Sequence, residues 1–157
     1  MQPRLGIYIH IPFCASKCGY CDFYSCAGAA ERMAEYQQAL LEHIEESAGR
    51  IAPAYIDTVY FGGGTPSFYG AARLIELLDA VKATGRLLKR AEVTVEVNPD
   101  SVRLHDLRAL RKAGFNRLSI GMQSANNDIL KMIIKSHPAD PAIRCQVIDR
   151  NFVQRFA

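Results

Sequence analysis

The chain repeats a strand, a loop and a helix four times, and this order restricts the fold more than any other feature. Strands of alternating or β-branched residues are predicted at residues 5–11, 58–61, 92–97 and about 116–121. Helices with apolar residues at helical spacing are predicted at residues 31–47, about 71–82, about 104–114 and about 126–133. Strands that alternate with helices form right-handed βαβ crossovers and a parallel sheet. The sequence therefore predicts an α/β fold.

Each predicted strand keeps one polar or small face, which is unusual for a parallel sheet covered by helices on both sides. In strand order, this face carries Tyr8 and His10, Tyr60 and Gly62, Thr94 and Glu96, and Ser119 and Gln123. A polar face must line a lumen or a ligand. We therefore predict an incomplete barrel of TIM type, about four βα units long, with its site at the carboxyl ends of the strands.

A compact cysteine triplet, Cys14, Cys18 and Cys21, follows the first predicted strand directly. Three thiolates within eight residues can hold one iron–sulfur cluster and leave an iron open to a further ligand. An amino acid's amine and carboxylate could chelate that iron. The alternative is a structural zinc site in which Cys26 or His10 supplies the fourth ligand.

Composition narrows the class of protein. The chain has 157 residues, of which 49% are hydrophobic and 22% charged, as in ordinary globular domains. Its formal net charge of +3 is spread without a block of like charge, so nothing indicates a nucleic-acid partner. No apolar run approaches the roughly 18 residues of a membrane span. Five cysteines without a secretory signal indicate reduced thiols, and we expect a cytoplasmic location.

Residues 5–133 resemble the radical S-adenosylmethionine superfamily, and within it the oxygen-independent coproporphyrinogen III oxidase-like proteins. The resemblance is carried by residues 8–14, 18–23, 61–67, 96–99 and 116–124, which read YIHIPFC, CGYCDF, FGGGTPS, EVNP and NRLSIGMQS. It implies a partial barrel of six βα units in the complete family fold.

The resemblance also implies roles for individual residues. Cys14, Cys18 and Cys21 would ligate a [4Fe–4S] cluster, and Tyr20 would position the adenine of S-adenosylmethionine. The remaining residues implied to lie near that cofactor are Tyr8, Gly62, Gly63, Gly64, Thr65, Glu96 and Gln123. Without the resemblance, the glycines would be a tight turn, Glu96 a solvated carboxylate and His10 a core histidine.

One position separates two branches of this family. The oxidase branch has a further cysteine two positions after the third cluster ligand, where this chain has Phe23. That difference is similar to the HemW-type branch of heme chaperones. The branch implies heme or porphyrin as a ligand, a flavodoxin-type electron donor and a heme-acceptor protein.

The resemblance weakens near the carboxyl end of the sequence. A Gly-Arg-x-His signature of the family is replaced by residues 134–137, where Lys135 stands for the arginine expected to meet the cofactor's carboxylate. Lysine keeps the charge but lacks the bidentate geometry. We interpret residues 1–137 as a shortened radical S-adenosylmethionine core and residues 138–157 as a divergent tail.

The shortened core leaves the fourth strand as an exposed edge that could mediate self-association. Three hypotheses follow: an enzyme that cleaves S-adenosylmethionine reductively, a heme-trafficking protein, or an inactive fragment. An oxidase of porphyrin biosynthesis remains the alternative to the heme chaperone.

Overall fold

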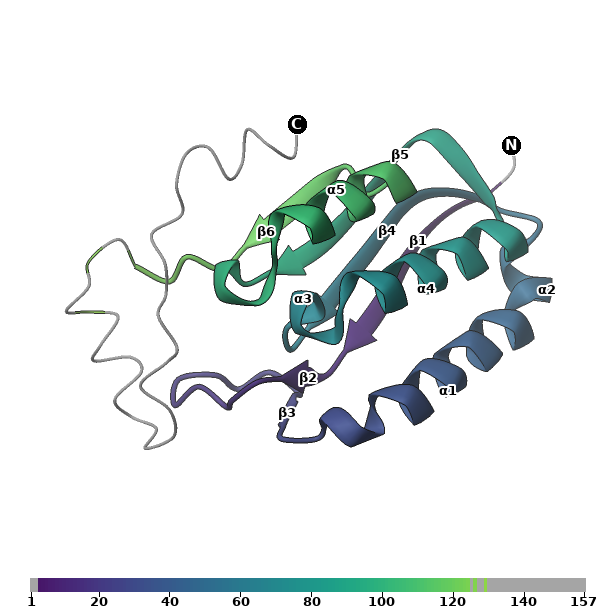
Figure 1. The fold of residues 1–157 in the computed structure, drawn as a ribbon. Helices are drawn as coiled ribbons and strands as arrows, with labels where there is room; N and C mark the ends of the chain where they lie inside the picture. The colour runs from purple at the N-terminus through teal and green to yellow at the C-terminus, as the bar shows by residue number, and fades with distance from the viewer. Residues whose placement is uncertain (1–2, 125, 127–128, 130–157) are drawn as a thin grey trace.

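The computed structural model describes residues 3–124, 126 and 129 of the chain. The helix predicted at about residues 126–133, Lys135 and the predicted tail therefore lie, in whole or in most part, outside the described residues. The described elements form an α/β fold with a layer of helices over a parallel sheet (Figure 1).

The sheet has four parallel strands in the order β1-β4-β5-β6. Their bounds are Arg4–Ile11 for β1, Tyr55–Gly63 for β4, Arg86–Val97 for β5 and Arg117–Ile120 for β6. Every sheet neighbour is also the next sheet strand along the chain, as expected for successive βα units. The predicted parallel α/β arrangement is confirmed.

Helices cover one face of this sheet. The main ones are α1 (Met33–Glu46), α4 (Ala71–Thr84) and α5 (Leu104–Ala113), and α2 (Ala48–Ile51) follows α1 directly. Figure 1 shows α1 and α4 side by side, with α5 beyond α4. None of the helices in the described part of the chain has the length and apolar character that crossing a membrane requires.

The core lies between the helices and the apolar face of the sheet. Strand β4 contributes Val59 and Phe61, both fully buried, and the Phe61 ring lies 5.1 Å from the ring of Phe115. Helix α4 contributes four side chains with 0% exposure at helical spacing: Leu74, Leu77, Leu78 and Val81. This is the amphipathic pattern of a helix that packs on a sheet.

Two strands are longer than predicted. β4 begins at Tyr55 and β5 at Arg86, and these two residues pair with each other across the sheet. Their early segments contain a bulge around Asp57 and a charged run at residues 89–90, which interrupt the alternation that a pattern search detects.

The short elements that the sequence did not predict include β2 (Phe13–Cys14), β3 (Cys26–Ala27) and α3 (Pro66–Tyr69). Helix α3 places Tyr69 in the core, where its ring stacks on Phe13 at 5.4 Å. The Tyr69 hydroxyl donates to the Met33 carbonyl at 3.2 Å and to Gln37 Oε1 at 2.8 Å. Burial raises the pKa of Tyr69 to about 12, so this phenol stays a donor and ties α1 to the base of the cysteine loop.

Candidate functional site

The carboxyl ends of the four parallel strands meet at one edge of the sheet. Ile11 at the end of β1 pairs with Gly63 at the end of β4, and Val97 of β5 pairs with Ile120 of β6. The cysteine loop follows β1 and the glycine turn follows β4, so both leave the sheet at this edge (Figure 1). Ligand sites of parallel α/β folds lie at this position.

The cysteine loop is closed at its base by a small parallel ladder. β2 pairs with β3, and the Cys26 N–H donates to the Pro12 carbonyl at 2.8 Å. Within the loop, the Cys21 N–H donates to the Cys18 carbonyl at 3.1 Å, which forms a turn between the second and third cysteines. Cys18 is exposed and Cys14 and Cys21 are half-buried, and all three are free thiols.

Cys26 lies on the other side of the loop from Cys14. It pairs with Phe13, and side chains at paired positions of neighbouring strands share a face while adjacent residues alternate. Cys26 and Phe13 line a groove with Tyr36 of α1, about 490 Å³ in volume, which Cys14 does not line. The geometry therefore disfavours the zinc site in which Cys26 would complete a tetrahedron with the cysteine triplet.

His10 is also unsuited to be a zinc ligand in this arrangement. Its Nε2 lies 2.8 Å from the Tyr24 carbonyl and must donate to it, and its Nδ1 lies 3.0 Å from the Tyr8 hydroxyl. In the neutral imidazole both nitrogens are thereby used. Among the described residues, no three His, Cys, Asp or Glu side chains stand together as ligands of one metal ion.

The glycine turn docks directly on the cysteine loop. The Gly64 N–H donates to the Ile11 carbonyl and the Thr65 N–H to the Phe13 carbonyl, both at 2.8 Å. The Thr65 hydroxyl lies 3.5 Å from Cys14 Sγ. Cys14 thus contacts Thr65, the last residue of the segment Gly62, Gly63, Gly64 and Thr65, although 51 positions separate the two in the sequence.

Gly63 is placed by its backbone conformation. Its φ of 124° is one that residues with a side chain rarely adopt, and an added Cβ would lie 2.7 Å from the His10 ring. The turn can therefore pass close to the end of β1 only with glycine at this position.

Glu96 is held by both of its carboxylate oxygens. The Tyr60 hydroxyl donates to Oε1 at 2.7 Å, and the Gly63 N–H donates to Oε2 at 3.1 Å. Burial, followed by the hydrogen bond to Glu96, raises the pKa of Tyr60, so the phenol stays protonated and donates. The Glu96 side chain is thus held in one position at the strand ends by two hydrogen bonds. This differs from the solvated carboxylate that the sequence alone also allowed.

Tyr8 connects this carboxylate to the cysteine loop. Its ring stacks on Tyr60 with centroids 6.0 Å apart, and its hydroxyl contacts His10, which in turn bonds the loop at Tyr24. Burial, and then the charge of Glu96, raises the pKa of Tyr8. The polar face therefore forms one connected network that runs from β5 through β4 and β1 to the loop.

Two residues implied by the resemblance lie in more exposed positions. Tyr20 is 52% exposed, and Gln123 is exposed with a φ of 56°. Lys135 lies outside the described residues. The structure adds Tyr60, for which the sequence indicated only a place on the polar face, and Lys17, for which the sequence carried no signal.

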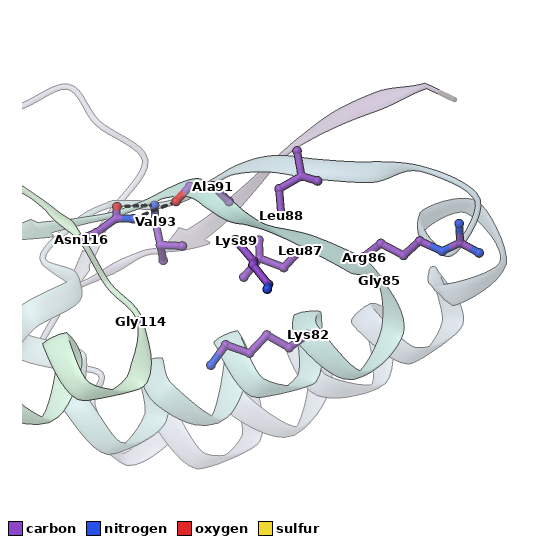
Figure 2. A pocket seen from close by; sticks show the side chains of 10 residues that line it. All are labelled: Lys82, Gly85, Arg86, Leu87, Leu88, Lys89, Ala91, Val93, Gly114 and Asn116. Carbon is purple, nitrogen blue, oxygen red and sulfur yellow. Dashed lines mark hydrogen bonds between the residues drawn. The ribbon is translucent and has the colours of Figure 1, made fainter. Parts of the chain in front are cut away.

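A second cavity lies at the opposite edge of the sheet (Figure 2). It has a volume of about 420 Å³ and lies between the end of α4 and the start of β5. Two of its polar side chains, those of Lys82 and Asn116, have hydrogen-bond partners within the fold. Lys82 Nζ donates to Asp79 at 2.7 Å and to the Ala113 carbonyl at 2.8 Å, and the Asn116 side chain bonds the backbone of Val93 and Ala91. We interpret this cavity as a structural junction.

The comparisons with known proteins agree with this geometry. The family model described as the Radical SAM superfamily matches residues 8–146. Curated relatives named "Heme chaperone HemW" include those of Buchnera aphidicola from Schizaphis graminum, 35% identical over 96% of this chain, and of Escherichia coli K12, 38% identical over 90%. That of Mycobacterium tuberculosis is 39% identical over 87%. The chain spans only 41%, 38% and 35% of these relatives' lengths, respectively.

A solved structure is also similar. Coproporphyrinogen III oxidase (HemN) from Escherichia coli, described as a radical SAM enzyme, superposes with a TM-score of 0.80 and 27% sequence identity. The superposition covers 99% of this chain and 33% of that one. The predicted partial-barrel fold is confirmed by this likeness.

Proposed function

The chain belongs to the radical S-adenosylmethionine superfamily, and we propose that it holds a [4Fe–4S] cluster on Cys14, Cys18 and Cys21 and binds S-adenosylmethionine beside it. The observation that carries this proposal is the contact of the cysteine loop with the glycine turn at the strand ends. It joins two segments that are distant in the sequence and places soft sulfur donors beside groups suited to a polar ligand.

The donor set fits a cluster better than a single ion. Thiolates are soft ligands that select iron–sulfur clusters, zinc or Cu(I). The ligands of one zinc ion must all lie within about 2.3 Å of it. The thiolates of a cluster bind different iron atoms, so their sulfurs need not converge on one point. Cys14, Cys18 and Cys21 are three free thiols on one loop, the number that the proposed cluster requires.

When bound, such a cluster would supply a one-electron donor and an iron with an open coordination position for the amine and carboxylate of S-adenosylmethionine. The residues of this chain would then bind and orient that cofactor. The fixed Glu96 carboxylate can accept hydrogen bonds from a ribose or an ammonium group, and the glycine turn allows close approach of a polar ligand to the backbone. Tyr8, Tyr20, Gln123 and Lys135 are proposed as further contacts, on the resemblance alone.

Replacing Glu96 by glutamine should weaken S-adenosylmethionine binding by on the order of 10-fold, because a charge-assisted acceptor becomes neutral. A glutamine NH₂ would also face a second donor, either the Tyr60 hydroxyl or the Gly63 N–H, so we expect about 1 kcal/mol lower stability. Calorimetric titration of the reconstituted protein measures the affinity.

The matched control is Glu92→Gln on the same strand. Glu92 is an exposed carboxylate, and Arg117 Nη1 lies 3.3 Å from its Oε1. This variant should bind S-adenosylmethionine as the wild type does. Equal losses in both variants would show that Glu96 has no specific role in the site.

We further propose a role in heme trafficking, supported by the curated relatives that are named heme chaperones. Heme or a porphyrin would be the ligand, a flavodoxin-type protein the electron donor and a heme-dependent protein the acceptor. Free thiols need a reducing compartment, so we propose the cytoplasm as the location.

Titration of the chain with heme, followed by its absorbance spectrum, tests this role. A heme chaperone should give a spectral change that saturates at a fixed ratio of heme to chain. A spectrum that remains that of free heme at every ratio would remove heme binding from the function of this chain, without affecting the proposed cluster.

Oxidative decarboxylation of coproporphyrinogen III is the second candidate, favoured by the likeness to the solved oxidase. Against this candidate, Phe23 stands where the resemblance implies a further cysteine in the oxidase branch, and the Phe23 side chain is 68% exposed. An anaerobic assay of the reconstituted chain with coproporphyrinogen III, S-adenosylmethionine, a reductant and an electron acceptor separates the two candidates, because only the oxidase forms the decarboxylated product.

A further inference from the structure

A lysine lies inside the cysteine loop and bonds across it. Lys17 occupies the position before Cys18, and its Nζ donates to the Phe23 carbonyl at 2.8 Å and to Ser25 Oγ at 3.0 Å. Ser25 Oγ in turn lies 3.3 Å from the Phe23 carbonyl and donates to it. These three groups form a small closed network between the first half of the loop and the segment that returns to β3.

This placement is unusual for a lysine. An ammonium group is strongly hydrated, and its long side chain loses rotamer freedom when it is held in one position. Lys17 is half-buried and makes two short contacts within the loop. Hydrogen bonds to charged groups contribute more to stability than hydrogen bonds between neutral groups, about 1.5–3 kcal/mol each in general. The two hydrogen bonds of Lys17 can therefore offset the conformational entropy that is lost when the loop is ordered.

The other hydrogen bonds of the cysteine loop connect different parts of it. The Cys26 N–H closes its base at Pro12, and His10 bonds the Tyr24 carbonyl near its return. The Cys21 N–H bond to Cys18 spans only one turn. Lys17 is different because it joins the segment between Cys14 and Cys18 to the segment after Cys21. The part of the loop that it closes contains Cys18 and Cys21, and Cys14 directly precedes this part.

We propose that Lys17 is a positioning residue that preorganises the cysteine loop for iron–sulfur cluster assembly. The inference rests on the proposed function, since it concerns the same three cysteines. Lys17 acts through the Phe23 carbonyl and Ser25 and is not itself a ligand. Its effect on the loop exists before any cluster is present, and this allows it to be tested separately.

Hydrogen exchange of the metal-free chain, measured by mass spectrometry on a peptide that contains residues 14–26, is the first test. Lys17→Met removes the donors and keeps the length of the side chain, so the loop amides should exchange about 10-fold faster. Lys17→Arg retains a charged donor and should restore most of the protection. Lys89→Met, on β5 at the opposite end of the sheet, is the control for loss of a lysine charge.

The second test is the rate at which a reconstituted cluster loses iron to a chelator. Lys17→Met should lose iron several-fold faster than the wild type, and Lys17→Arg and Lys89→Met should resemble the wild type. Unchanged exchange in Lys17→Met overturns the inference, and so does faster exchange with unchanged iron loss. If the wild type takes up no iron, the proposed cluster is wrong, and the exchange data alone then decide whether Lys17 orders the loop.

Discussion

Replacing Cys14 by serine should abolish cluster assembly while the chain remains folded. Serine offers a hard oxygen where a cluster requires a soft thiolate, and two remaining cysteines cannot hold it. Cys14 is half-buried at the end of β2 and contacts the Thr65 hydroxyl, a contact that serine can partly keep. Iron and sulfide content after anaerobic reconstitution measures the effect, and a thermal melt verifies the fold.

Cys26→Ser is the matched control for this prediction. Cys26 lies on the same small ladder but lines the groove with Phe13 and Tyr36, on the side away from Cys14. Its replacement should leave iron and sulfide content near the wild-type value. If Cys26→Ser also lost its metal, four cysteines would ligate it. A zinc site or a four-cysteine cluster would then be favoured over the three-cysteine cluster proposed for this loop.

Replacing Gly64 by alanine should have the second largest effect. An added Cβ would lie 2.8 Å from the carbonyl oxygens of Phe13 and Pro12 and 2.9 Å from Cys14 Sγ. Two of these contacts are with backbone, which cannot rotate away. Overpacking of this kind costs about 1–3 kcal/mol, so the midpoint of thermal unfolding should fall by several degrees. Because the clash also displaces Cys14, iron uptake should fall to a small fraction of the wild-type value.

Gly49→Ala separates this steric effect from the general effect of removing a glycine. Gly49 is an exposed residue of α2, and an added Cβ there has no atom within 4 Å. In a helix, alanine is favoured over glycine by about 1 kcal/mol. This control should therefore melt at the same or a higher temperature. Equal melting and equal iron uptake in Gly64→Ala would show that the loop and the glycine turn are not packed as described.

The sequence pattern was sufficient to predict the parallel sheet and its polar face. Alternation in β1 separated the buried Ile9 and Ile11 from Tyr8, which is 58% exposed. The order of strands and helices indicated parallel pairing, and the topology agrees. These features follow from local periodicity, which a single sequence displays directly.

The pattern did not indicate how the strand ends are connected. The two hydrogen bonds that hold Glu96 come from Tyr60 and Gly63, which lie on a different strand, 36 and 33 positions earlier in the sequence. Such contacts depend on the register between strands, which periodicity does not fix. The hydrogen bonds of Lys17 depend on the irregular conformation of the cysteine loop, which no periodic pattern in the sequence indicates. The elements β2, β3 and α3 are only two to four residues long, too short to show a period.

The central claim, a redox-active cluster that meets S-adenosylmethionine, is tested most directly by electron paramagnetic resonance. The chain is reconstituted anaerobically with iron and sulfide, reduced, and measured at low temperature with and without S-adenosylmethionine. We expect a [4Fe–4S]⁺ signal that changes when the cofactor is added, because the cofactor would occupy the open iron. A chain that takes up no cluster, or a signal that the cofactor leaves unchanged, would contradict the account.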